Sequence, residues 1–274
     1  KGRAQRQRLR RSVRLEAEAL ARLSHPGVVA VLDRGVVDTH ADRELVPGAP
    51  WLAIEFCEGG HLQLEQIDNW KHLRALIVDL LRVLSHIHAR GILHGDLKPA
   101  NILFDEKPNG QHRRPKIADF GLARLFAAGG ADYSSIAGTP LYMAPEQIRN
   151  DWRQMGPPTD LYGLACVIWR LLTGLSPHGI EATDIHSTLF GHLHWNPCEL
   201  EPRFDVPDTL ESWLTRSLQK RAADRFVCAA DALAQLPQMK TPRYRESVPV
   251  PNLSEDVIPS TQIVWSPDRT GVAY

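Results

Sequence analysis

Three polar residues, Asp96, Lys98 and Asn101, lie close together in the segment 91–101. An aspartate can accept the proton of a hydroxyl group, a lysine can contact a phosphate, and an asparagine oxygen can bind a metal ion. Phosphoryl transfer needs little covalent chemistry from a protein, so a base, a cation and a metal ligand held in one loop supply most of the catalysis. The spacing therefore predicts a phosphoryl-transfer loop.

The same segment resembles the catalytic loop of protein kinases, whose usual form is His-Arg-Asp-Leu-Lys-x-x-Asn. His94, Asp96, Lys98 and Asn101 match that form. Gly95 stands where the family usually has an arginine that pairs with a phosphorylated activation loop, which argues against that form of switching. A His-Gly-Asp triplet also occurs in small-molecule phosphotransferases, so this loop alone leaves both kinds of enzyme open.

Three further segments follow in the order that the family shows. Residues 117–124 resemble the Asp-Phe-Gly motif, in which Asp119 would bind the magnesium ion that bridges the nucleotide phosphates. Residues 137–147 resemble the peptide-positioning loop that ends in Ala-Pro-Glu, which small-molecule kinases lack, and 160–174 resemble the buried central helix. Each segment alone could be an ordinary turn or helix start. Together they imply an α+β, two-lobed protein-kinase-like fold with an incomplete small lobe and a mostly helical large lobe.

The resemblance divides the chain into three parts. Residues 1–54 would form a partial small lobe with the regulatory helix and two strands, and 55–236 would form the hinge and the large lobe. Residues 237–274 carry six prolines without helical periodicity, so we expect a linker or tail.

Glu16 is the acid of the regulatory helix that the resemblance implies would pair with a lysine of the third strand, with Glu18 as the competing candidate. The family's glycine-rich loop and that lysine should precede Glu16, yet only fifteen residues do so. Lys1 could be this lysine, or the lysine could lie upstream. Because the chain starts at Lys1 rather than at methionine, we expect a fragment of a longer protein.

Residues 54–60 resemble the hinge between the lobes. There the backbone groups of Glu55 and Cys57 would hydrogen-bond the edge of adenine, Ile54 would border the inner pocket, and Leu103 would lie beneath the adenine ring. His61 stands where many relatives have an acid for ribose.

Apolar residues at helical spacing predict a core helix over 68–90, with Asp68 as its N-cap and Gly91 after its end. Short apolar runs predict strands at 28–36, 51–56, 102–104 and 116–118.

The resemblance implies roles for the remaining site residues. Thr139, together with Lys98, is typical of kinases that phosphorylate serine or threonine, so the expected catalytic residues are Asp96, Lys98, Thr139 and Glu16. Asn101 and Asp119 would bind Mg²⁺, and ATP would be the phosphate donor. Arg225 would form a buried, structural ion pair with Glu146.

Composition limits the partners. The chain has 274 residues, 43% of them hydrophobic, with 32 basic and 32 acidic residues, so no overall field favours nucleic acid or a membrane surface. The chain contains no apolar run of about 18 residues, so no membrane span is predicted. The four cysteines show no paired spacing, which favours reduced thiols in a cytoplasm. We expect protein substrates as partners and allow for a further domain beyond the chain.

Three hypotheses about function stay open at this point. The first is a serine/threonine protein kinase. The second is a catalytically weak, pseudokinase-like regulatory or binding domain, suggested by the missing glycine-rich loop. The third is a small-molecule phosphotransferase, suggested by the His-Gly-Asp triplet.

Overall fold

The computed structural model describes residues 23–37, 48–105, 114–120, 140–179 and 185–238. Contacts divide the chain into two units, Lys1–Met239 and Lys240–Tyr274, and all described residues belong to the first. The predicted tail 237–274 therefore lies almost wholly outside the described residues. None of the helices in the described ranges is long and apolar enough to cross a membrane.

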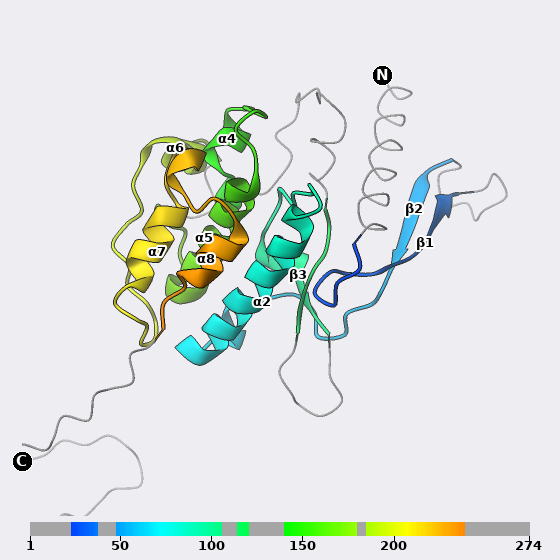
Figure 1. Ribbon diagram of the computed structural model, residues 1–274, viewed down its shortest axis with the longest axis horizontal. Coiled ribbons are helices and arrows are strands. Elements are labelled where there is room, and N and C mark those ends of the chain that lie inside the picture. The colour runs from blue at the N-terminus through cyan, green and yellow to red at the C-terminus, as the bar shows by residue number, and fades with distance from the viewer. Residues whose placement is uncertain (1–22, 38–47, 106–113, 121–139, 180–184, 239–274) are drawn as a thin grey trace, which may run out of the picture. The chain divides into compact units, whose positions relative to one another are not determined.

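Helix α2 (Trp70–His88) is one of two long core helices (Figure 1). Its apolar residues recur on one face and are buried, which is why this stretch folds as an amphipathic helix against the core. The prediction of Asp68 as N-cap was wrong, because the side chain of Asn69 accepts the hydrogen bond from the His72 amide at 3.0 Å. Asp68 instead accepts a hydrogen bond from the Asn69 side chain at 2.7 Å.

Helix α5 (Pro157–Thr173) is the second long helix, and it is buried almost all round. Proline at its first positions removes backbone donors that would have no partner there. Gly174 ends the helix in the left-handed region, with φ of 83°, which glycine adopts without steric cost. The predicted central helix 160–174 is thus confirmed, with a start three residues earlier.

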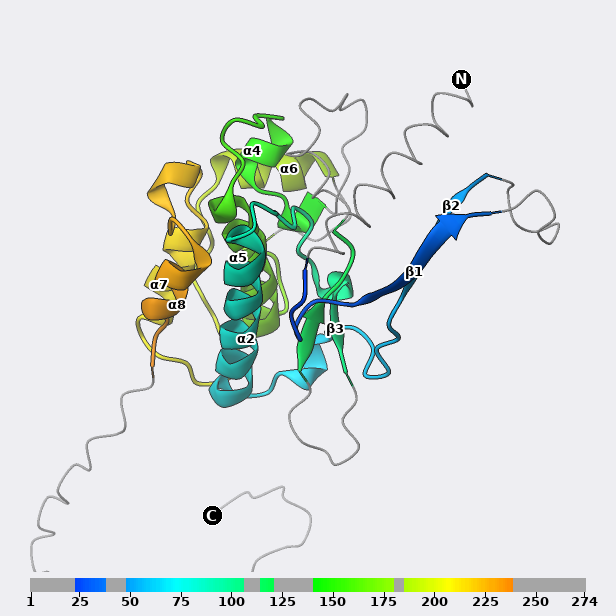
Figure 2. The same cartoon turned by 45° about the vertical axis from the view of Figure 1, so that its right-hand side comes forward.

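Shorter helices surround α5. Helices α7 (Leu210–Ser217) and α8 (Ala229–Ala234) contact α5, and α8 also contacts α2 (Figures 1 and 2). The other helical segments are α4 (Pro145–Ile148), α6 (Ile185–His194), and the 3₁₀ turns η1 (Leu64–Gln66), η2 (Pro99–Asn101), η3 (Pro140–Tyr142) and η4 (Ala222–Asp224).

The described strands form two antiparallel pairs. Strand β1 (Val31–Val36) pairs with β2 (Pro50–Ile54), and β3 (Ile102–Phe104) pairs with β4 (Pro115–Ile117). The Val29 amide donates to the Ile117 carbonyl at 3.0 Å, so the segment before β1 lies along β4. The predicted strands are confirmed with ends shifted by a few residues, and the architecture is the expected α+β fold.

Candidate active site

The carboxylate of Asp160, near the start of α5, holds the predicted catalytic loop in place. Its Oδ1 accepts the Gly95 amide at 2.7 Å, and its Oδ2 accepts the His94 amide at 2.9 Å. His88, at the end of α2, approaches the same Oδ2 with its Nε2 at 2.8 Å. Burial alone would raise the pKa of Asp160, but the hydrogen bonds and nearby histidines outweigh it and keep the pKa below its usual value. Two core helices therefore fix the loop through one buried carboxylate.

His94 links the loop to the segment that contains Asp119. Its imidazole is fully buried, its Nε2 lies 3.0 Å from the Ala118 carbonyl, and its ring centroid lies 4.9 Å from that of Phe120. The Asp96 amide donates to His94 Nδ1 at 3.2 Å. Because Nδ1 accepts a hydrogen bond, Nε2 carries the proton and donates a hydrogen bond to the Ala118 carbonyl. The ring thus joins the backbone of Asp96 to the residues on either side of Asp119.

Asp96, Lys98 and Asn101 meet in one cluster. The Lys98 ammonium donates to Asp96 Oδ2 at 2.6 Å, and the Asn101 side-chain nitrogen donates to the Asp96 carbonyl at 2.9 Å. The side chain of Asp96 is 13% exposed and that of Lys98 is 21% exposed, so the carboxylate stays reachable while its orientation is fixed. The structure therefore brings together the three residues that the sequence singled out first.

Asp119 lies in the left-handed region with φ of 58°, which few residues other than glycine adopt. Its neighbours are both fixed, since the Ala118 amide donates to the Asn101 carbonyl at 2.9 Å and Phe120 is fully buried. The Asp119 residue itself is exposed. Backbone strain that is held by its surroundings is common at functional sites.

The side-chain oxygens of Asn101 and Asp119 are of the kind that bind a magnesium ion. The Asn101 side-chain nitrogen donates to the Asp96 carbonyl, which leaves the side-chain oxygen as the candidate metal ligand, and Asp119 is exposed. Carboxylate and amide oxygens are ligands that Mg²⁺ takes alongside phosphate oxygens. Within the described ranges no group of three or more His, Cys, Asp or Glu side chains forms a metal site by itself.

Glu55, in the segment predicted to be the hinge, is anchored by its side chain. Its amide donates to the Ala30 carbonyl at 2.9 Å, its Oε1 accepts the Ala30 amide at 2.7 Å, and its Oε2 accepts Lys116 Nζ at 2.6 Å. Partial burial would raise the pKa of Glu55, but the hydrogen bonds from Lys116 and Ala30 lower it below the usual value. Burial likewise would lower the pKa of Lys116, and the bond to Glu55 raises it instead. Both groups therefore stay charged near neutral pH.

Cys57 and Leu103 lie together against the segment that leads to Asp119. Cys57 forms a small apolar cluster with Val29 and Ala118, and Leu103 packs against it. The Gly59 amide donates to the Phe104 carbonyl at 3.0 Å, which holds the hinge beside β3. Among the described residues, no backbone hydrogen bond uses the Glu55 carbonyl or the Cys57 amide. Ile54 ends β2, 42% exposed.

The predicted ion pair between Glu146 and Arg225 is confirmed. Arg225 donates from both Nη atoms to the carboxylate, at 2.7 and 2.8 Å, and only 1% of Arg225 is exposed. Thr159 Oγ1 also donates to Glu146 Oε1, at 2.7 Å. Next to Glu146, the Gln147 side chain donates to the Gly95 carbonyl at 2.6 Å, so α4 is tied to the catalytic loop.

Some predicted residues lie outside the described ranges, namely Glu16, Thr139 and Lys1. Conversely, reasoning from sequence missed Lys116 and Gln147 and assigned His88 only a general structural role. Their partners lie 52 to 72 positions away in the chain, so no local pattern indicated them.

Comparison with known proteins gives the family. Residues 1–235 match the model described as Protein kinase domain. The chain belongs to the protein kinase family. It is 30% identical over 231 residues to serine/threonine-protein kinase PknB of Mycobacterium tuberculosis. The match covers 81% of this chain and 35% of that protein.

Two other relatives have similar matches. Serine/threonine-protein kinase PknJ of Mycobacterium bovis is 30% identical, covering 79% of this chain and 36% of its own length. Serine/threonine-protein kinase pkn3 of Myxococcus xanthus is 30% identical, covering 84% of this chain and 42% of its own length. The chain thus spans well under half the length of these curated relatives.

Proposed function

We propose that this protein kinase domain transfers the γ-phosphoryl group of ATP to serine or threonine residues of other proteins. The observation that carries the proposal is the contact of Lys98 with Asp96 at 2.6 Å. His94 and Asn101 of the same loop both bond to the backbone of Ala118, the residue before Asp119. The three relatives reported above, all named serine/threonine-protein kinases, support the same choice.

Each residue of this cluster has a task in the proposed reaction. Asp96 accepts a hydrogen bond from the hydroxyl of the acceptor and takes its proton as the hydroxyl oxygen bonds to the γ-phosphorus. The bond between that phosphorus and the bridging oxygen breaks at the same time, and ADP leaves. The Lys98 ammonium lies beside that carboxylate and stabilises the negative oxygens of the group in transfer. Asn101 and Asp119 would hold Mg²⁺, which supplies neutralisation of phosphate charge when bound. Thr139 would complete the acceptor site, and Glu16 would orient the lysine that contacts the phosphates.

The hinge supplies the proposed adenine site. The Glu55 carbonyl and the Cys57 amide, unused by the described residues, would bond the adenine edge, while Ile54 and Leu103 would contact its ring. In this arrangement 1–54 form the partial small lobe, 55–236 the hinge and large lobe, and 237–274 a linker or tail. The proposed partners are protein substrates, and the proposed location is the cytoplasm.

The test replaces Asp96 with asparagine in the chain expressed together with any residues that its gene encodes on either side. Transfer of radiolabel from ATP to a mixture of generic protein substrates should fall at least about 10³-fold, because the base is lost. Binding of a fluorescent ATP analogue should change little. Asp79→Asn, an exposed site on α2, is the matched control and should retain activity. Unchanged transfer by Asp96→Asn would contradict the proposal.

The two alternatives predict different results. A small-molecule phosphotransferase would label sugars, choline or aminoglycosides in preference to proteins, although the Pro140–Tyr142 turn and α4 resemble the peptide-positioning segment that such enzymes lack. A pseudokinase would bind nucleotide without transferring label, and the names of the relatives give no support to that alternative.

A further inference from the structure

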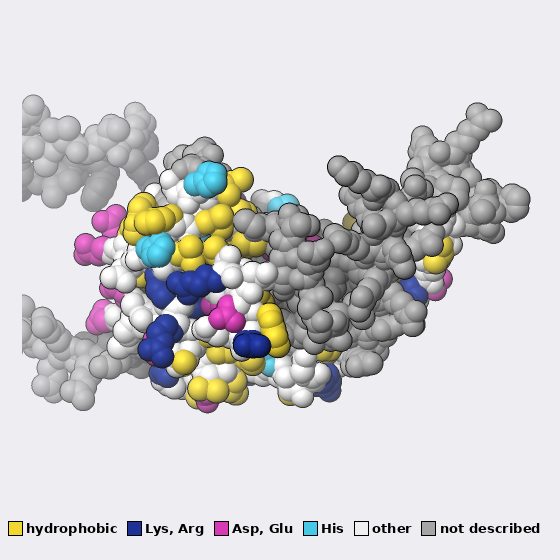
Figure 3. Space-filling view, turned by 90° about the horizontal axis from the view of Figure 1, so that it is seen from above, with side chains coloured by type: hydrophobic (Ala, Val, Ile, Leu, Met, Phe, Trp, Pro, Cys, Tyr) yellow, Lys and Arg dark blue, Asp and Glu magenta, His cyan; other side chains and the backbone are white. Residues whose placement is uncertain are grey.

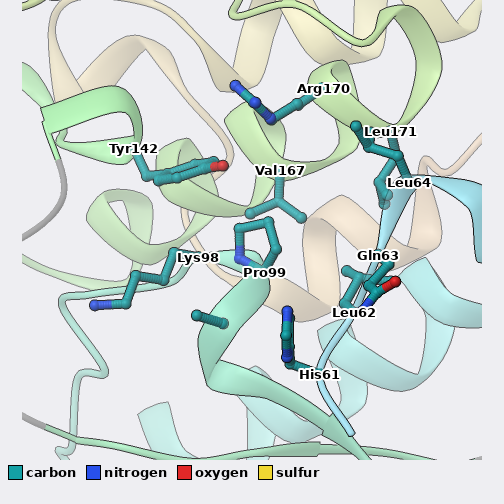
Figure 4. A pocket seen from close by; sticks show the side chains of 11 residues that line it. His61, Leu62, Gln63, Leu64, Lys98, Pro99, Tyr142, Val167, Arg170 and Leu171 are labelled. Carbon is teal, nitrogen blue, oxygen red and sulfur yellow. The ribbon is translucent and has the colours of Figure 1, made fainter. Parts of the chain in front are cut away.

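A cavity of about 390 Å³ opens beside the catalytic cluster. It is lined by Lys98 and Pro99 of the catalytic segment, by Tyr142 of η3, and by Val167 and Arg170 of α5, with His61 at its edge (Figure 4). One wall is therefore the segment that carries the proposed catalytic residues. The opposite wall is the core helix on which that segment rests.

The charge of this cavity is one-sided. None of the described residues that line it is Asp or Glu, whereas Arg170 is cationic. Lys98 also lines the cavity, but its ammonium is paired with Asp96 at 2.6 Å. The chain as a whole is neutral. On the face shown in Figure 3, Lys and Arg side chains lie beside hydrophobic ones, with an Asp or Glu side chain among them. The cavity is thus a local electropositive site in a protein without net charge.

Arg170 is the residue that gives the cavity its specificity. It is partly buried, and it forms no ion pair with any Asp or Glu in the part of the chain that the structure describes. The guanidinium reaches over the hydroxyl end of Tyr142, while the Lys98 ammonium turns away from the cavity (Figure 4). By contrast, the buried Arg225 has a bidentate carboxylate partner at 2.7 and 2.8 Å. A partly desolvated guanidinium is best satisfied by a carboxylate or phosphate, which matches its planar set of donors.

Tyr142 adds a second donor. Burial raises the pKa of its phenol, and Arg170 opposes that rise, so the two groups are close enough to interact electrostatically. The phenol is protonated at neutral pH, because its usual pKa is already about 10. It can therefore donate its proton to an anion that Arg170 also contacts.

We propose that this cavity binds an anionic side chain of the protein substrate, an acidic or a phosphorylated residue within a few positions of the phosphate acceptor. The inference rests on the proposed function, and it names the substrate class of the same site. Arg170 would form paired hydrogen bonds to the anion, Tyr142 would donate a third, and His61 would lie at the entrance. A basic side chain at the same position would meet Arg170 and be rejected by repulsion between like charges.

The test is a set of serine peptides in which each of about four positions on either side of the acceptor carries glutamate, phosphoserine, alanine or lysine in turn. The kcat/KM value should be roughly 10-fold higher for an anion than for lysine at one position, which corresponds to one desolvated charge contact. Arg170→Glu should reverse the preference at that position alone. Arg82→Glu, an exposed site on α2, makes the same change of net charge outside the cavity and should leave the preference unchanged.

The arms of the experiment separate the possible outcomes. Preference for phosphoserine over glutamate would assign the cavity to a previously phosphorylated substrate, and equal or greater preference for glutamate would assign it to an acidic sequence. Efficient phosphorylation with no preference at any position would overturn this inference and leave the kinase function standing.

A binding measurement covers the case in which no peptide is phosphorylated, which would count against the kinase function. Fluorescein-labelled peptides with alanine in place of the acceptor serine are then compared by anisotropy. Tighter binding of the anionic peptide, lost in Arg170→Glu, supports the inference without turnover. Equal binding of anionic and basic peptides overturns it.

Discussion

Lys116 donates a hydrogen bond of 2.6 Å to Glu55 and so joins the strand that leads to Asp119 with the segment that we propose binds adenine. Their side chains are only 12% and 25% exposed. The same Glu55 carboxylate also accepts the Ala30 amide at 2.7 Å. One carboxylate thus sets the relative positions of three segments around the proposed nucleotide site.

Replacing Glu55 with glutamine should weaken ATP binding by about 3- to 10-fold. The change removes the charge from a hydrogen bond worth about 1–2 kcal/mol and leaves Lys116 with Asp105, at 3.7 Å, as its acidic neighbour. Calorimetric titration with an ATP analogue measures the effect. Glu58→Gln is the control, since Glu58 lies on the same segment and is exposed. Adding Lys116→Met to Glu55→Gln should cost less than the sum of the two changes, and strict additivity would show that the pair is not coupled.

Asp160→Asn should lower kcat at least about 10²-fold, although Asp160 does not contact the reacting groups. The His94 and Gly95 amides now donate to different oxygens of the carboxylate, at 2.9 and 2.7 Å. In asparagine one of these oxygens becomes an NH2 donor, so one of the two backbone amides loses its acceptor. Steady-state kinetics should show the loss mainly in kcat, with KM for ATP little changed. Asp231→Asn, exposed on α8, serves as the control. A normal kcat in Asp160→Asn would contradict the role of this carboxylate as a support of the loop.

Arg225→Ala should reduce the free energy of unfolding by about 3–5 kcal/mol, because it leaves the buried Glu146 carboxylate without its cation. Arg225→Lys should lie between the alanine variant and the wild type, since lysine cannot form the bidentate contact. Urea denaturation followed by circular dichroism gives the values. Arg221→Ala, at a side chain that is 78% exposed, should change stability by less than about 0.5 kcal/mol. A small effect of Arg225→Ala would mean that water replaces the guanidinium.

His178 and His192 should make stability fall as pH is lowered from 7 to 5. Burial lowers the pKa of His178 to about 4 and that of His192 to about 3, helped by Lys220. His192 Nδ1 lies 2.7 Å from the Tyr162 hydroxyl, so neutral imidazole suits this site. The unfolded chain binds protons near pH 6.5 and the folded chain does not, so the stabilisation is complete above that pH and is lost as pH falls toward the folded values.

The measurement for the histidines is the slope of the unfolding free energy against pH between 5 and 7. His192→Gln should reduce that slope by less than half, whatever its effect on stability at pH 7. Burial also lowers the pKa of His178, His25 and His86, so these three histidines continue to contribute to the slope. His194→Gln, at an exposed position on the same helix, should leave the slope unchanged. An equal slope in His192→Gln would show that this histidine is not neutral in the folded state.

The local patterns of the sequence were sufficient for the elements and for the central loop. Leu73, Ile77, Leu80 and Leu84 recur at helical spacing, and α2 follows from that period with an error of one residue at its cap. Asp96, Lys98 and Asn101 are so close in the chain that any fold of that loop keeps them near one another. The resemblance to protein kinases extended this to Glu146 and Arg225, 79 positions apart, which no periodicity would have joined.

The contacts that support the loop could not be read in the same way. Asp160 is an ordinary first-turn acid of a helix by sequence, and only packing of α2 against α5 brings His88 to its carboxylate. The contact of Lys116 could not be predicted either, because the sequence shows only a polar residue in a short strand. Its partner Glu55 lies 61 positions away, and the register of β3 with β4 decides which face of the strand it occupies.

The sequence by itself determined the class of chemistry, the order of the helices and strands, and the identity of the residues in the central loop, because these depend on neighbours along the chain. Tertiary structure alone decided which charges are neutralised and which are left for a ligand. Arg225 is buried against a carboxylate, whereas Arg170 lines an open cavity without an acidic partner among the described residues. Electrostatic interactions depend on distance and burial in space, and neither quantity is written in the spacing of residues along a chain.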